Sequence, residues 1–289
     1  SIAEWRGGEG DFVPGMNSRI IVDMDSRPPE KGGNSPAETE KDKETNETAD
    51  AQALWDVATL MQELCKKQGH ALTGVTVCKG TQKDTRPGDI YLGYAEEENG
   101  LGEEGYTCDI TDKCVIKAES AVGVRWGTVT LLQILSRNND IPQGQIRDYP
   151  RYEVRGFGID VARKPVSLDT LYAMMETMSF YKMNDLTIHL NDNEILSTSG
   201  LTDSVEQAMT ADSAFRLESD LVGEDGQKLT SSEYAYTKEE LAHFIETAKT
   251  YGVTVVPEID TPAHSLSITQ RFPSYALKTR PEAVDQIDL

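Results

Sequence analysis

Residues 153–289 alternate between short, continuous apolar runs and stretches whose apolar positions recur at helical spacing. Three runs, 154–162, 186–190 and 253–259, carry apolar residues on both faces, which is typical of parallel strands covered by helices. Helical spacing separates them, over residues 168–181 and between a capping box at 237–240 and Gly252. The order strand, helix, strand, helix, strand predicts an α/β fold, either a doubly wound sheet or a barrel.

The first half of the chain has a different pattern. Apolar stripes predict helices at 51–68 and 121–136, and strand-like runs surround them. We therefore expect an α+β domain over residues 17–149, followed by a second domain over 150–289. Residues 1–16 are Gly-rich, so we expect an irregular N-terminal arm. Residues 26–50 are almost entirely polar, which predicts a flexible excursion within the first domain.

Polar side chains follow each predicted strand of the second domain. Arg163 ends the first strand, Asp192 follows the second, and Asp260 and His264 follow the third. The carboxyl ends of parallel strands meet at one edge, where α/β proteins bind ligands. No Gly-rich phosphate loop follows any strand. A site built from side chains at successive strand ends favours a (β/α)8 TIM barrel, of which the first three βα units are present.

Each of these residues also has a simpler interpretation. Arg163 alone is compatible with a surface ion pair, Asp192 with a turn cap, and His264 with a packed neutral histidine. His189 lies on the second strand itself, where a core position and a site-lining position are both open. Two carboxylates and a histidine also allow a metal site at Asp192, Asp260 and His264. The shared position at strand ends is what favours one common site.

Composition and charge narrow the function. The 289 residues hold 28 basic and 49 acidic side chains, so the formal net charge is 28 − 49 = −21, which argues against nucleic-acid binding. No apolar run is long enough for a membrane span, and the first residues show no charged n-region followed by an apolar h-region, so we expect either that a signal was removed or that this is a piece of a longer protein. The cysteines lack the C-x-x-C spacing of zinc sites, and reduced thiols and a disulfide both remain open for Cys65, Cys78, Cys108 and Cys114.

Three motifs in order resemble glycoside hydrolase family 20, the β-N-acetylhexosaminidases and lacto-N-biosidases. They are residues 155–163 (Arg-Gly-Phe-Gly-Ile-Asp-Val-Ala-Arg), 182–192 (Lys-Met-Asn-Asp-Leu-Thr-Ile-His-Leu-Asn-Asp) and 256–265 (Val-Pro-Glu-Ile-Asp-Thr-Pro-Ala-His-Ser). They resemble the first three strands of that family's barrel. Residues 106–110, 115–118 and 127–133 are similar to the accessory α+β domain that precedes it.

The resemblance implies a site for the terminal sugar of a glycan, with no cofactor and no metal. Arg163 matches an arginine that binds ring hydroxyls, and Asp192 and His264 match an Asp–His pair that tunes the proton of the catalytic acid. Asp260, Glu258 and His189 are the other expected substrate-binding residues. In the family the substrate's own acetamido oxygen attacks the anomeric carbon, an Asp orients it, and the adjacent Glu protonates the leaving oxygen.

The sequence departs from the family pattern at that Asp-Glu pair, which occurs nowhere in the chain. We expect the N-terminal part of a secreted or cell-surface bacterial glycosidase, inactive without the remainder of its barrel. Its substrate would carry a terminal N-acetylhexosamine or lacto-N-biose, and the long connection 195–236 weakly favours the lacto-N-biosidase branch. The alternative is a non-catalytic carbohydrate-binding or interaction module that uses the same pocket.

Overall fold

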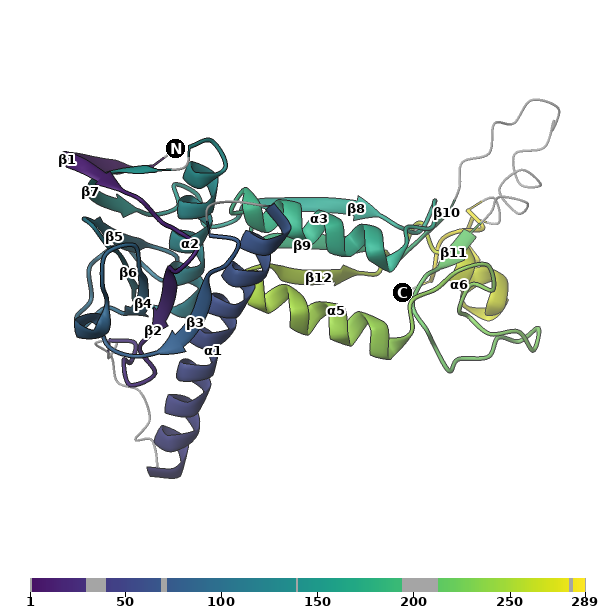
Figure 1. Ribbon diagram of the computed structural model, residues 1–289. Helices are drawn as coiled ribbons and strands as arrows, with labels where there is room; N and C mark the ends of the chain where they lie inside the picture. Colours follow the sequence, from purple (N-terminus) through teal and green to yellow (C-terminus); the bar gives the residue numbers. More distant parts are fainter. Residues whose placement is uncertain are drawn as a thin grey trace. The chain divides into compact units, whose positions relative to one another are not determined.

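The computed structural model describes residues 2–29, 40–68, 72–138, 140–193, 213–280 and 283–288 (Figure 1). The chain forms two compact units. The first comprises Ser1–Glu153 with Thr250–Gly252, and the second comprises Val154–Lys249 with Val253–Leu289. Among the described residues, no helix is long and apolar enough to cross a membrane.

A seven-stranded mixed sheet forms the first unit, in the order β1-β7-β5-β6-β4-β2-β3. The strands β3, β2, β4 and β6 are parallel, and β6, β5, β7 and β1 are successively antiparallel. Their bounds are β1 (Glu4–Phe12), β2 (Arg19–Val22), β3 (Thr76–Lys79), β4 (Ile90–Tyr94), β5 (Tyr106–Ile110), β6 (Cys114–Ala118) and β7 (Ile141–Asp148). A 3-10 turn, Gln82–Asp84, precedes β4.

Two helices, α1 (Glu40–Gln68) and α2 (Ala121–Leu135), contribute buried apolar side chains to one core together with the strands of this sheet. The side chain of Ser120 caps α2 by accepting from the backbone N–H of Gly123, at 3.2 Å. A Cβ on Gly127 would lie 2.5 Å from Cγ2 of Ile116, so α2 packs directly on β6. All four cysteines lie in this unit as free thiols, and the Sγ atoms of Cys108 and Cys114 are 3.3 Å apart.

Two expectations for the first unit were wrong. The predicted irregular arm over residues 1–16 contains β1, which pairs with β7 through its backbone. Because every β1 side chain except Phe12 is exposed, the strand has no alternating apolar pattern that would reveal it. The predicted flexible excursion over 26–50 ends earlier, because α1 begins at Glu40. Residues 45–49 are exposed on that helix, and residues 30–39 lie outside the described part.

A three-stranded parallel sheet forms the centre of the second unit, with β9 (Asp185–His189) between β8 (Gly156–Asp160) and β12 (Thr254–Glu258). The helices α3 (Leu168–Phe180) and α5 (Lys238–Thr250) follow β8 and precede β12. The rings of Tyr172 on α3 and Phe244 on α5 meet edge to face at 5.0 Å, so the two helices are neighbours. Strand order in space follows strand order in the chain, as a barrel requires. Closure into eight units stays a prediction.

Shorter elements follow the strands of this unit. The strand β10 (Asn191–Asn193) comes one residue after β9 and pairs with β11 (Ser213–Phe215). A short helix, α6 (Leu266–Arg271), and a 3-10 turn, Pro273–Tyr275, lie beyond β12. Residues 195–212 of the predicted long connection lie outside the described part, and the rest of it includes β11. Asp192 is therefore held inside a two-stranded ladder immediately after the central strand.

Candidate active site

The register of the parallel sheet places three titratable residues side by side. Asp160, His189 and Glu258 are the last residues of β8, β9 and β12, and Asp160 and Glu258 each pair with His189. Paired positions in a parallel ladder point to the same face. The predicted convergence of polar groups at the ends of these strands is therefore present in the structure, and on β8 it begins at Asp160, three residues before Arg163.

The carboxylate of Asp192 is the centre of the site, and its side chain is only 2% exposed. One oxygen, Oδ2, lies 2.6 Å from Nη2 of Arg163 and 2.7 Å from Nε2 of His189. The other, Oδ1, lies 2.9 Å from Nδ1 of His264 and accepts from the backbone N–H of Asn193 at 2.6 Å. Burial by itself would raise the pKa of Asp192, but these hydrogen bonds and the Arg163 charge lower it overall.

His189 lies between two carboxylates. Its Nε2 faces Asp192, and its Nδ1 contacts Oε1 of Glu258 in a short hydrogen bond. A neutral imidazole has a single N–H, so both contacts are satisfied together when the ring is an imidazolium. Burial lowers the pKa of His189, yet the bonds to Asp192 and Glu258 outweigh burial and raise it. The two carboxylates thus favour the protonated form of the imidazole that lies between them.

Arg163 joins the strand ends through both arms of its guanidinium. Nη1 donates to Oδ2 of Asp160 at 2.6 Å, Nη2 pairs with Asp192, and Nε donates to the carbonyl of Asn193 at 3.3 Å. The hydrogen bond with Asp160 is the main cause of its raised pKa. Its side chain is partly exposed. A guanidinium carries five N–H groups, so these three contacts leave two for another acceptor.

The loop after β12 is positioned by Asn191, which the sequence reasoning missed. The buried Asn191 side chain accepts from the N–H of Asp260 at 2.7 Å and donates to the carbonyls of Asp260 at 3.0 Å and His264 at 3.3 Å. This clamp holds His264 in a left-handed backbone conformation (φ 57°) with its ring toward Asp192. Asp160 was also missed, although its position three residues before Arg163 at a strand end was a usable signal.

Of the six predicted site residues, five belong to one connected network, in which Asp192 contacts Arg163, His189 and His264, and His189 contacts Glu258. Asp260 joins through its backbone bonds to Asn191, and its charge contributes to the raised pKa of Arg163. Their role in substrate binding stays a prediction. Within the described residues, no group of three or more His, Cys, Asp or Glu side chains is arranged to hold a metal ion. The network offers charge-assisted hydrogen bonds to hydroxyls and a carboxylate that orients an imidazole.

Family models match most of the chain. The model "Glycosyl hydrolase family 20, domain 2" matches residues 35–149, and "Glycosyl hydrolase family 20, catalytic domain" matches residues 152–288. The first lies within the unit built on the seven-stranded sheet. The second covers the parallel sheet and every residue of the network just described.

Named relatives agree with these models. The chain is 32% identical over 161 residues to the N,N'-diacetylchitobiase of Vibrio harveyi, which covers 53% of this chain and 18% of that protein. It is 31% identical over 186 residues to the beta-N-acetylhexosaminidase of Cellulomonas fimi, with coverages of 61% and 34%. The chain therefore matches only about a fifth to a third of these relatives' length.

Solved structures share the fold. The chitobiase of Flavobacterium johnsoniae superposes with a TM-score of 0.68 at 21% identity, covering 96% of this chain and 37% of that one. The GH20 beta-N-acetylhexosaminidase of Streptomyces coelicolor A3(2) gives a TM-score of 0.66 at 20% identity, with coverages of 99% and 50%. At these identities the likeness establishes the α/β fold that they share.

Proposed function

Because this chain belongs to glycosyl hydrolase family 20, we propose that it forms part of a glycosidase that removes a β-linked N-acetylhexosamine from the non-reducing end of a glycan. The observation that carries the proposal is the convergence of Arg163, Asp192 and His264 at the ends of adjacent parallel strands. The names of the curated relatives support the same substrate class.

Arg163 is the proposed anchor of the terminal sugar. Asp160 and Asp192 fix its guanidinium from two sides, so little side-chain entropy is lost when a hydroxyl binds. The two N–H groups not engaged by these contacts donate to ring hydroxyls in this proposal. The fixed orientation would place the anomeric carbon relative to the strand ends, which is the positioning that retaining hydrolysis needs.

Asp192 and His264 form the proposed proton-tuning pair. Nδ1 of His264 faces the Asp192 carboxylate at 2.9 Å, which favours an N–H on that nitrogen and leaves Nε2 to face the rest of the site as the acceptor of the tautomer so selected. The imidazole can then accept a hydrogen bond from a protonated carboxyl group above it. Such a bond favours the protonated form of a general acid until the leaving oxygen takes the proton.

The general acid itself is proposed to lie outside these 289 residues, because the chain contains no Asp-Glu pair. Further strands of the same barrel are its proposed source. In the described sheet, β8 and β12 each pair on one side only, with β9. The proposed partner of these edges is the remainder of the barrel, which would complete the sheet and carry the Asp-Glu pair.

Activity assays with an aryl N-acetyl-β-glucosaminide test this proposal. The complete protein should turn over the substrate, and the 289-residue chain alone should not. In the complete protein, Arg163→Ala should lower kcat/KM by about 100-fold, the order expected for a misplaced substrate. The matched control is Arg147→Gln, in the other unit. Turnover by the isolated chain, or an unchanged rate in Arg163→Ala, would overturn the assignment.

A carbohydrate-binding module is the second candidate, favoured by the same absence of the Asp-Glu pair. It requires only that Arg163 and its neighbours hold a sugar. Calorimetry with N-acetylglucosamine and the isolated chain should then show saturable binding that Arg163→Ala abolishes. If the complete protein proves catalytically silent while this binding persists, the module is the better description.

Two finer points belong to the proposal. An aryl lacto-N-bioside in the same assay distinguishes disaccharide release from monosaccharide release, for which the long connection 195–236 is the motivating feature. We also propose a secreted or cell-surface location in a bacterium, which fits a glycan substrate and the acidic composition. Fractionation of the native host, with recovery in the cytosol as the contrary result, tests the location.

A further inference from the structure

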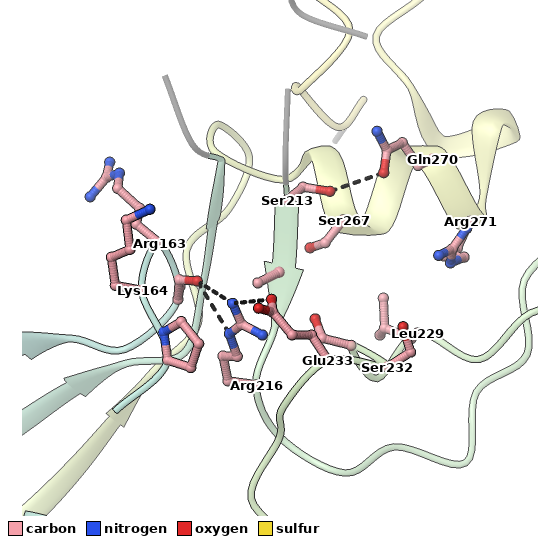
Figure 2. A pocket seen from close by; sticks show the side chains of 14 residues that line it. Arg163, Lys164, Ser213, Arg216, Leu229, Ser232, Glu233, Ser267, Gln270 and Arg271 are labelled. Carbon is pink, nitrogen blue, oxygen red and sulfur yellow. Dashed lines mark hydrogen bonds and ion pairs between the residues drawn. The ribbon is translucent and has the colours of Figure 1, made fainter. Parts of the chain in front are cut away.

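A pocket of about 530 Å³ lies beside the candidate active site, within the second unit (Figure 2). Its walls come from the residues after β8, from β11 and the segment that follows it, and from α6. Its volume is that of a small-molecule site. Arg163 lines this pocket and also belongs to the network around Asp192. Figure 2 shows that its side chain extends away from Arg216.

Arg216 is the buried charge of this pocket, with a side chain only 5% exposed. Nε and Nη2 donate to the carbonyl of Ala162 at 3.2 and 3.1 Å, and Nη1 donates to the carbonyl of Tyr234 at 3.0 Å. Among the described residues its ion-pair partner is Glu233, 3.7 Å away and with a side chain 76% exposed. A buried guanidinium held by neutral carbonyls and one distant, hydrated carboxylate is only partly compensated.

Ser267 adds a second, independent signal. It is 6% exposed and lines the pocket from α6, and its Oγ has no hydrogen-bond partner in the described part of the chain. A buried hydroxyl without a partner costs free energy unless a ligand or water supplies one. Arg271 and Gln270 lie on the same helix wall, and Gln270 accepts from the Ser213 hydroxyl at 2.9 Å. Arg271 pairs with Asp225 at 2.7 Å.

We propose that this pocket binds an oxyanion, a carboxylate or a sulfate, carried on a sugar unit of the glycan. Arg216 supplies the buried, only partly compensated positive charge, Ser267 donates its hydroxyl hydrogen, and Arg271 supplies a second cation at the wall. The inference rests on the proposed function, because Arg163, the proposed anchor of the terminal sugar, also lines this pocket and would bring the glycan beside it. The net charge of −21 repels free anions, so saturable anion binding requires a local site of this kind.

Calorimetry with the 289-residue chain tests the pocket without any hydrolysis. The probes are glucuronate, inorganic sulfate and neutral glucose. Saturable binding of glucuronate, tighter than that of sulfate, is expected, and glucose should not bind. Ser267→Ala and Arg271→Gln should each weaken glucuronate by about 10-fold, the loss of one charge-assisted hydrogen bond. The control is Arg147→Gln, which removes one positive charge in the first unit. Arg216 is left unchanged because its three carbonyl contacts support the local fold.

Failure here is separable from failure of the proposed function. The pocket assignment is overturned if glucuronate shows no saturable binding. It is also overturned if Ser267→Ala and Arg271→Gln bind glucuronate as tightly as the control Arg147→Gln does. Binding of sulfate but not of glucuronate overturns the sugar-borne source. Glucuronate binding that persists in Arg163→Ala, while N-acetylglucosamine binding is lost, supports the pocket as a separate site. Circular dichroism of each variant confirms that a lost signal reflects the pocket rather than unfolding.

Discussion

At the scale of single residues, the Asp192 carboxylate accounts for most of the organisation of the site. It accepts from Arg163, His189, His264 and the backbone of Asn193 while nearly excluded from water. A buried carboxylate is tolerated only when donors surround it, and here the donors are the side chains proposed to bind and orient the substrate. One residue therefore links stability and function.

Removing the charge of Asp192 should destabilise the second unit. In Asp192→Asn, Arg163 and His189 lose their shared anion, although both keep some contact with water or another carboxylate. We expect a loss of about 2–3 kcal/mol, less than the cost of breaking a fully buried ion pair. Urea unfolding followed by far-UV circular dichroism measures it. The control is Glu246→Gln, whose exposed pair with Lys249 at 2.6 Å should matter by less than about 0.5 kcal/mol.

The pKa shifts of Asp192 and His189 predict how stability depends on pH. The pKa of Asp192 is lowered, so its contribution is present above about pH 4 and is lost as pH falls through its folded value. The pKa of His189 is raised, so its contribution is present below about pH 6.5 and is lost as pH rises through its folded value. Urea midpoints across this range test both directions. Replacing His189 by Gln should remove the alkaline loss; an unchanged alkaline slope would contradict the imidazolium.

At the scale of elements, a glycine in α2 allows the helix backbone to approach the sheet more closely than any side chain would permit. The helix α2 rests on β6 through Gly127, where a Cβ would also lie 3.1 Å from the ring of Tyr106. Helix propensity favours Ala over Gly by about 1 kcal/mol, so local preference and packing oppose each other there. Packing is expected to dominate, because the neighbours belong to the buried core.

Gly127→Ala should therefore destabilise the first unit, by about 1–3 kcal/mol, despite the better helix former. Tryptophan fluorescence during urea unfolding reports this unit, since Trp5, Trp55 and Trp126 all lie in it. Gly15→Ala is the control, because no atom lies within 4 Å of the added Cβ. A stabilised Gly127→Ala variant would show that the helix can move away from the sheet.

At the scale of the whole molecule, the two units differ in how completely their sheets are covered. The first has seven strands and a continuous core against α1 and α2. The second has three strands, and apolar side chains on them are exposed, including Phe157 at 46% and Val256 at 40%. Less apolar surface is buried per ordered residue in the second unit, so its stability should be lower.

The isolated chain should accordingly unfold in two stages. Because the tryptophans report only the first unit, circular dichroism should begin to change at lower urea than fluorescence does. Hydrogen exchange should likewise be faster in β9 than in β6, although both strands are central. Coincident transitions with equal protection of the two strands would show that the second unit needs no further strands.

The sequence by itself determined the order of the three parallel strands and their helices in the second unit, the change of pattern near residue 150 and the residues at the strand ends. Periodicity and capping are local, so they can be read along the chain. Strands β1 and β7 and the start of α1 were missed, because residues that are exposed or only half-buried leave no regular apolar pattern. Only the tertiary structure decided that His189 lies between two carboxylates, that Asn191 clamps the Asp260–His264 loop, and that Arg216 and Ser267 share a pocket. Those contacts depend on strand register and loop closure, which join residues far apart in the chain.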